Sequence, residues 1–332
     1  MNHLNLRAVA ASLNIMALLT SCSTNNGLRK FDDSNIQKEI PADVAEKFEV
    51  KDVSALPKLT VNVEVLKKEV TKKNKIKTKE KKGKHVTEVP VPVVPPTRRV
   101  EPMPFLEGEK LNYDIRFMGV TAATLALEVL PAKVVNDRKV YHLSGHAKTL
   151  KLFELVYRVD DLIESFFDYD GLFSHRFTMN LDESKQSRKL IELYDYDKNK
   201  SFYWNRIDHV EKGFSEQKEE HDIKPLSLDP LSLLYFMRVV PLPQNAGETI
   251  KVPVIMDGKQ WESVFTFDRK EKISIGSRNF EANVFKLENF QNGELKNKGN
   301  TVWISNDEHR YFLRIEAKVK VGSFAIALDR IL

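Results

Sequence analysis

The chain has 332 residues, a formal net charge of +5, 42% hydrophobic residues and a single cysteine. One thiol cannot form an internal disulfide, and the lack of a second cysteine excludes zinc and redox sites built on cysteine pairs. The charge is uneven, because residues 23–104 contain 18 lysine and arginine residues against 12 acidic ones, whereas residues 105–332 contain 33 against 35. The basic character therefore belongs to the N-terminal third.

The N-terminus has the layout of a secretory signal. Residues 2–7 are weakly basic, residues 8–19 are mostly apolar, and small residues precede Cys22. The ending Leu19-Thr20-Ser21-Cys22 resembles the lipobox of bacterial lipoproteins. This resemblance implies a signal peptide over residues 1–21 that is cut off, a diacylglyceryl group on Cys22 and acylation of the new N-terminus.

Two alternatives to a lipid anchor at Cys22 are a plainly cleaved signal and an uncleaved transmembrane anchor. The apolar run over residues 8–21 is shorter than the roughly 20 residues that a membrane span needs, and Asn14 interrupts it. Two or more acyl chains, such as palmitate, anchor a protein stably, whereas one chain binds only marginally. In the bacterial pattern an aspartate after the cysteine favours the inner membrane, and this chain has Ser23. We therefore predict a lipid anchor in the outer membrane of the cell envelope, with the folded domain in the periplasm.

Residues 22–104 have the composition of a disordered tether. Ten lysines lie within Lys67–Lys84 against only two glutamates, so like-charge repulsion should keep this block extended. A proline-rich run over residues 89–96 favours the stiff polyproline II conformation. A coil of this length would span about 50 Å and could hold the domain well away from its membrane. Within this range, the alternation over residues 59–65 predicts one short strand.

Three functions fit the lysine block. It can be a solvated spacer, or it can contact peptidoglycan or anionic lipid headgroups, since polybasic segments bind anionic surfaces. Nucleic acid is not an expected partner, because no aromatic residues that could stack on bases are interleaved among Lys67–Lys84.

Residues 105–332 predict one antiparallel β domain. Apolar and polar residues alternate over residues 111–117, Gly119 marks a turn, and residues 123–129 form the next apolar face, which is a hairpin signal. The clearest alternation runs over residues 311–321. Further alternating segments are residues 141–147, 162–167, 173–181, 190–196, 249–254, 261–267, 280–287, 301–304 and 324–328. We expect about a dozen strands in a curved sheet, either a half-barrel or an open barrel.

One helix is predicted among these strands, near residues 230–238. Asp229 can cap its N-terminus, Pro230 suits the first helical position, and Arg238 suits the end. The residues between them are apolar on nearly every side, so the helix should be buried on the concave side of the sheet.

Four motifs carry a resemblance to a known family. They are Gly108-Glu109-Lys110-Leu111-Asn112-Tyr113, Asp229-Pro230-Leu231-Ser232-Leu233-Leu234-Tyr235 with Arg238, Trp303-Ile304-Ser305-Asn306-Asp307 and Val321-Gly322-Ser323. Residues 105–332 thereby resemble an uncharacterised family of exported bacterial proteins, a domain of unknown function. The resemblance implies a sheet wrapped around a helix, similar to periplasmic lipoprotein-carrier and lipid-binding half-barrels, and it supplies no catalytic residues. This chain has Arg310-Tyr311-Phe312-Leu313 where the family usually has a basic residue followed by Leu-Pro.

Few residues suggest chemistry, and we expect no metal site or cofactor. His142 and His146 are four residues apart, which on a strand separates them by about 13 Å, too far to share a metal ion. Asp160, Asp161 and Glu164 could serve a polysaccharide hydrolase or lyase if two of them converged. On a strand, however, Asp160 and Glu164 lie about 13 Å apart and Asp161 faces the other side.

Aromatic residues crowd one region and are interpreted mainly as core, with a ligand surface as the alternative. They are Tyr157, Phe166, Phe167, Tyr169, Phe173, Tyr194, Tyr196, Phe202, Tyr203 and Trp204. Trp303 precedes a polar turn, which indicates a buried structural role.

The resulting hypothesis is an envelope lipoprotein that binds or carries an apolar or glycan-containing component without catalysis. One alternative is a module that docks on envelope proteins or peptidoglycan. Another is an enzyme acting on envelope polysaccharide. An apolar cavity would favour the first, an exposed aromatic patch the second and converging carboxylates the third.

Overall fold

The computed structural model describes residues 27–31, 40–55, 97–318 and 323–332. Cys22, the lysine block, the proline run and the strand expected over residues 59–65 lie outside this part of the chain. No helix among the described residues is long and apolar enough to cross a membrane.

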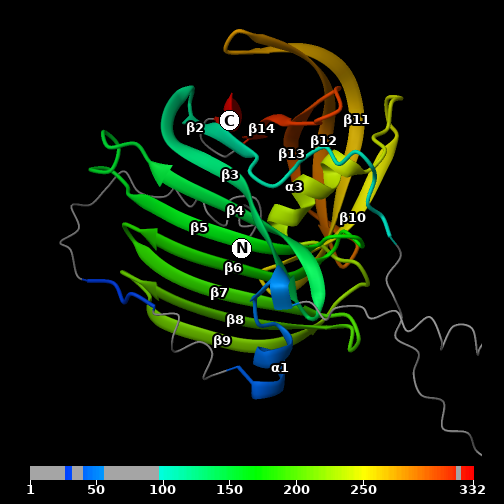
Figure 1. The fold of residues 1–332 in the computed structure, drawn as a ribbon. Coiled ribbons are helices and arrows are strands. Elements are labelled where there is room, and N and C mark those ends of the chain that lie inside the picture. Colours follow the sequence, from blue (N-terminus) through cyan, green and yellow to red (C-terminus); the bar gives the residue numbers. More distant parts are fainter. Residues whose placement is uncertain (1–26, 32–39, 56–96, 319–322) are drawn as a thin grey trace, which may run out of the picture.

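One antiparallel sheet dominates the fold (Figure 1). Its strands are β2 (Lys110–Phe117), β3 (Val120–Val135), β4 (Arg138–Thr149), β5 (Val159–Asp168), β6 (Ser174–Glu183), β7 (Gln186–Asp195), β8 (Lys200–His209), β9 (Gly213–Asp222), β10 (Thr249–Met256), β11 (Lys259–Ile275), β12 (Arg278–Gln291), β13 (Glu294–Ser305), β14 (Phe312–Lys318) and β15 (Ser323–Ile331). The predicted fold class, a curved antiparallel sheet with one internal helix, is confirmed.

The chain enters this sheet in the middle. Strands β2 to β9 run outward to one edge, the helix α3 (Pro230–Val239) crosses the interior, and β10 begins the opposite edge. The following strands return to the centre, where β15 pairs with β2. Strands β9 and β10 remain the two edges, so the sheet is open. Figure 1 shows α3 between the wall formed by the first half and the wall formed by β10–β13.

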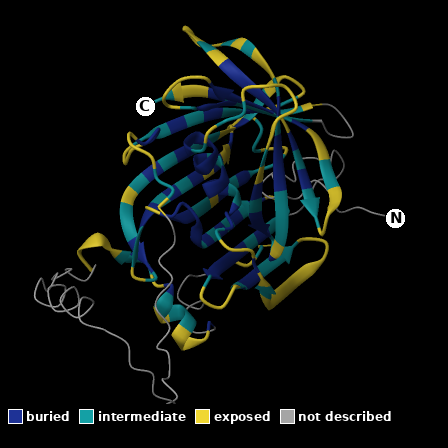
Figure 2. Ribbon diagram, turned by 90° about the vertical axis from the view of Figure 1, so that its right-hand side faces the viewer, coloured by how far each residue is buried: buried dark blue, intermediate teal, exposed yellow. Residues whose placement is uncertain are grey.

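The alternation read from the sequence accounts for the walls. In β2, Leu111, Tyr113 and Ile115 are buried on one face, while the residues between them are partly exposed. The turn to β3 places Gly119 at φ +83°, a conformation that favours glycine. Figure 2 shows the same division across the fold, with buried residues between the walls and exposed ones mainly at the turns.

The N-terminus of α3 is fixed by a buried carboxylate. Oδ1 of Asp229 accepts hydrogen bonds from the backbone N–H groups of Leu231 and Ser232, each at 2.8 Å. The hydroxyls of Ser165 and Ser174 donate to Oδ2, each at 2.6 Å. The predicted cap therefore also anchors the helix to β5 and β6.

The other end of α3 is fixed by a buried ion pair. Arg238 donates to both carboxylate oxygens of Glu109, at 2.6 and 2.8 Å. It also donates to the backbone oxygens of Pro104 and His309. Arg310, in the corner where the chain departs from the family pattern, donates to the carbonyl of Val239 at 3.2 Å. This corner therefore contacts the C-terminal end of the helix.

Residues 40–55 pack on the outer face of the sheet, in a range that the sequence predicted as tether. They form the helix α1 (Ala42–Lys47), the two-residue strand β1 (Lys51–Asp52), which pairs with β3, and a 3-10 turn over Val53–Ala55. Phe48 is only 1% exposed. It belongs to a second hydrophobic cluster with Ile40, Val135, Val140, Phe166, Ile191, Leu193 and Trp204.

Residues 97–104, also within the predicted tether, lie against the sheet as well. The guanidinium of Arg99 lies 4.3 Å from the ring centre of Tyr169, and its Nε donates to the hydroxyl of Tyr141 at 3.1 Å. Met103 is buried in the main core. The folded unit therefore takes in residues 40–55 and 97–104 of the range 22–104, and residues 27–31 contact the sheet as well.

Candidate functional site

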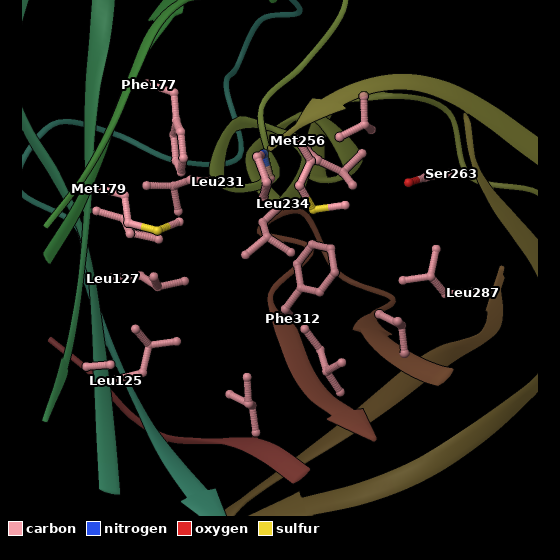
Figure 3. Close-up of a pocket in the computed structure, with 18 of the residues that line it drawn as sticks. Leu125, Leu127, Phe177, Met179, Leu231, Leu234, Met256, Ser263, Leu287 and Phe312 are labelled. Carbon is pink, nitrogen blue, oxygen red and sulfur yellow. The ribbon is translucent and has the colours of Figure 1, made fainter. Parts of the chain in front are cut away.

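A cavity of about 150 Å³ lies between α3 and the inner faces of the two walls (Figure 3). It is partly open to solvent. Strands β2 to β7 and β10 to β15 each contribute to its lining, and so does α3. The side chains labelled in Figure 3 are Leu125, Leu127, Phe177, Met179, Leu231, Leu234, Met256, Ser263, Leu287 and Phe312.

The lining has few polar side chains, and two of the contacts they make are with other groups of the protein. Ser263 donates to Oδ1 of Asn289 at 2.7 Å. Asp257 accepts a hydrogen bond from Arg188 at 2.6 Å. The remaining lining is almost entirely aliphatic and aromatic, so the cavity suits an apolar ligand that needs no hydrogen bonds.

The size of the cavity limits what it holds in this conformation. An engineered apolar cavity of similar volume in another protein binds benzene. A group of about this size fits between α3 and the walls. A longer hydrocarbon chain would have to extend through the open side.

The two edges of the sheet meet near the cavity through a turn. Gly258, at φ +65° in the β10–β11 turn, lies so close to β8 and β9 that a Cβ atom there would be 2.7 Å from the His221 ring and 2.9 Å from the Tyr203 ring. Beside it, Asp257 pairs with Arg188 of β7. A single bridge between Leu228 and Val254 adds a backbone contact. These contacts join the two edges of the open sheet, although no continuous ladder of backbone hydrogen bonds runs between them.

The histidines and two of the carboxylates form pairs on one face, away from the cavity. Nε2 of His142 lies 2.8 Å from Glu164, and Nε2 of His146 lies 2.6 Å from Asp160. The hydrogen bond with His142 lowers the pKa of Glu164. Among the described residues, no group of three or more His, Cys, Asp and Glu side chains is arranged to hold a metal ion.

Asp161 faces the opposite side of β5 and is buried. Burial, together with the neighbouring charge of Glu183, raises the pKa of Asp161 to about 9. Burial raises the pKa of Glu183 as well, and Tyr157 donates to that carboxylate at 2.6 Å. The three carboxylates that the sequence singled out therefore do not converge on one cleft. The geometry does not support the hydrolase or lyase hypothesis.

The comparison with protein families identifies the domain. The model of a family described as "Protein of unknown function (DUF3108)" matches residues 112–329. The chain belongs to this family. A search of curated proteins finds no match for this DUF3108 protein.

Solved structures similar to the DUF3108 protein have low sequence identity. A β-barrel-like protein of the DUF1849 domain from Brucella abortus is 8% identical, with a TM-score of 0.40, over 68% of this chain and 97% of that one. A protein from Bacteroides fragilis with a YmcC-like fold is described provisionally as exported. It is 12% identical to this chain, with a TM-score of 0.29, over 68% of this chain and 96% of that one. A Parabacteroides distasonis protein, provisionally described as a lipoprotein, is 9% identical, with a TM-score of 0.31, over 72% and 100%.

The ten aromatic residues that the sequence singled out in the DUF3108 domain pack mainly in the hydrophobic clusters, as expected. None of the ten that crowd residues 157–204 lines the cavity, and Trp303 is buried. The lining comes instead from residues such as Ala147, Leu125 and Ile163. Sequence reasoning did not find this site, because these residues have the same alternation as core residues. The one available signal was small or aliphatic residues at inward positions opposite the helix.

Proposed function

We propose that this DUF3108 protein is an envelope-anchored lipoprotein that binds the apolar part of an envelope component, such as an acyl chain, without catalysis. The apolar cavity between α3 and the sheet is the observation that carries the proposal. Anchoring through Cys22 to the outer membrane, with the domain in the periplasm, is part of the same proposal.

The cavity favours recognition by hydrophobic burial. Each methylene group that leaves water for such a lining contributes about 0.8 kcal/mol. Because the wall offers almost no free polar partner, selectivity would depend on the size and shape of the apolar group. A polar headgroup would remain at the open side, in contact with water. These properties suit the binding or carriage of lipids.

A cavity-filling variant tests the binding. Ala147 of β4 lines the cavity, so Ala147→Phe should occupy part of it. We expect binding of the fluorescent apolar probe N-phenyl-1-naphthylamine to weaken about tenfold or more, since the ring removes the space for one benzene-sized group. Ala126→Phe on the neighbouring β3 is the matched control, because Ala126 alternates with the lining residues Leu125 and Leu127 and does not line the cavity. Equal affinity of both variants and the unaltered protein would exclude the cavity as the site.

The natural ligand can be sought directly. Native mass spectrometry of the protein purified from its host should reveal a bound lipid, and Ala147→Phe should lose it. A bound glycan or protein in place of a lipid would favour the docking alternative.

The anchor has an independent test. Radiolabelled palmitate should attach to the protein in cells, and Cys22→Ser should abolish the label and release the protein from membranes.

Contact of Lys67–Lys84 with peptidoglycan is a further part of the proposal. Deletion of this block should reduce retention on purified peptidoglycan, and unchanged retention would remove that contact.

A further inference from the structure

One end of the sheet carries a group of exposed apolar side chains, here called the apolar rim. They lie in the loop between β4 and β5: Leu150 is 37% exposed, Leu152 78%, Leu155 95% and Val156 64%. The adjacent β2–β3 turn adds Met118 and Val120, both exposed. The two turns are tied by the hydrogen bond from the Leu150 N–H to the Ala122 carbonyl, at 3.0 Å. A folded protein rarely exposes such a group without a partner.

Residues 27–31 lie at the same end of the sheet. Ser187, at the start of β7, donates to the Arg29 carbonyl at 2.6 Å. The Arg29 N–H donates to Asp208, near the end of β8, at 3.0 Å. The ring of Phe31 lies 6.2 Å from that of Phe214 at the start of β9. These contacts fix where the chain arrives from its N-terminus.

A groove of about 1050 Å³ joins this segment to the apolar rim. Leu28 and Phe31 line it, and so do Leu155 and Val156. The N-terminal segment and the exposed leucines therefore border one surface.

The short distance to Cys22 gives this surface an orientation. Four residues separate Cys22 from Gly27, and the five extended steps from one to the other reach at most about 18 Å. A lipid on Cys22 would thus hold the bilayer close to the apolar rim. One lining residue of the cavity, Ala147 of β4, is three residues, or about 10 Å along the strand, from Leu150 of the apolar rim.

We propose that the loop Leu150–Val156 inserts into the membrane that holds Cys22 and turns the open side of the cavity toward the bilayer. The occupant of the apolar rim is therefore the lipid surface. The inference rests on the proposed anchor, and it places the domain on the membrane surface instead of at the end of a long tether. Leucine and valine side chains with a neighbouring lysine, Lys151, suit the boundary between headgroups and acyl chains.

Fluorescence quenching by lipids tests the insertion. The full chain, purified with its own lipid, is placed on vesicles of phosphatidylethanolamine and phosphatidylglycerol that contain brominated acyl chains. Leu155→Cys carries a bimane label, and Cys22 does not react because its sulfur is in a thioether. The matched control is Leu106→Cys, since Leu106 is 70% exposed and lies before β2, whose far end forms the β2–β3 turn. We expect quenching at position 155 to be several-fold stronger than at position 106.

Two other outcomes would overturn the inference: no quenching at either position, or equal quenching at both.

A second measurement separates failure of the membrane insertion from failure of the proposed lipid binding. The double variant Leu152→Glu, Leu155→Glu should keep binding of N-phenyl-1-naphthylamine in solution while losing insertion. If palmitate labelling shows no lipid on Cys22, the anchor fails. Co-sedimentation of the unlipidated chain with the same vesicles then decides whether the loop binds membranes, and a chain that stays in solution contradicts insertion.

Discussion

At the scale of single residues, the most unusual group is the buried carboxyl of Asp161. Its neighbour on β5, Asp160, is partly exposed. Burial alone would raise the pKa of Asp160, but hydrogen bonds from His146 and Lys148 lower this pKa below its usual value. Two adjacent residues thus have opposite shifts because a strand turns them to opposite faces. At neutral pH Asp161 retains a proton in the folded state that the unfolded chain has lost, so its burial costs stability.

The protonation of Asp161 predicts a pH-dependent stability. The folded-state pKa of about 9 exceeds the usual 3.8. The contribution of Asp161 to the free energy of unfolding is therefore most favourable at low pH and is lost as the pH rises from about 4 to 9. Asp161→Asn cannot titrate, so it should raise the free energy of unfolding by about 1–2 kcal/mol at pH 8 and by less at pH 5. Urea denaturation at both pH values measures this. Asp160→Asn is the control and should show no gain that increases with pH; a parallel gain in both variants would contradict the explanation.

At the scale of elements, α3 is held by polar groups at both ends and by apolar contacts along its length. Asp229 and its serine partners are buried, and so is Arg238, whose partner Glu109 is nearly buried. Both ends need complete pairing, because an unpaired buried donor or charge is costly. The helix forms one side of the cavity, so its position decides the shape of the binding site.

Loss of the helix cap should destabilise the protein and weaken ligand binding together. Asp229→Ala removes the acceptor of two backbone and two hydroxyl hydrogen bonds, and we expect a loss of about 2–3 kcal/mol. Asp229→Asn keeps a capping oxygen and should lose clearly less. Thermal unfolding measures the difference, and an Asn variant as unstable as the Ala variant would contradict the capping role.

The ion pair at the other end predicts strong coupling. Arg238→Met and Glu109→Gln should each cost about 3–5 kcal/mol, because each leaves a buried charge without its partner. The double variant should cost less than the sum of the two. A double-mutant cycle from urea denaturation gives the coupling energy; additive losses would show that the two residues act independently.

Sequence patterns predicted the elements with strong local signals. The cap of α3 and the β2–β3 hairpin follow from Asp229, Pro230 and the alternation around Gly119. Strands β8 and β9 were missed. In β9 each residue is exposed or nearly so, and its sequence has no apolar face. It is an edge strand held by its ladder to β8. Residues 40–55 were missed because a few apolar residues in a charged segment become meaningful only once the outer face of the sheet exists.

The cavity could not be predicted for a related reason. The sequence marks which side chains face inward, but whether they fill the interior depends on the distance between two walls formed by residues far apart in the chain. The inward positions of β4 and β12, for example, meet only after the sheet has curved around α3.

At the scale of the whole molecule, the outer cluster makes residues 40–55 part of the folded unit. Phe48 packs with Trp204 and Phe166 on the face opposite the cavity. Without this segment, the apolar outer face of β4 to β8 would be exposed to water. The segment that joins the domain to its N-terminus thus also stabilises the domain.

Removal of this cover should be measurable. Phe48→Ala should lower the free energy of unfolding by about 3–5 kcal/mol, as for other buried phenylalanines. A variant that lacks residues 1–56 should melt at a lower temperature and bind more of a hydrophobic dye than one that lacks residues 1–26. Val53→Ala is the control, since Val53 is exposed and should change little. Equal melting temperatures of the two truncated variants would show that the segment is dispensable.

The pairing of β15 with β2 has a consequence for biogenesis. During synthesis, β2 to β9 leave the ribosome long before β15 does, because β15 is the last strand of the sheet in the chain. Until the last residues arrive, β2 has one bare side that can add a strand from another copy. Completion of the sheet thus depends on the C-terminus, and pairing over so long a sequence separation is intrinsically slow. Any partner that shields β2 during that interval would keep the incomplete sheet from pairing with another copy.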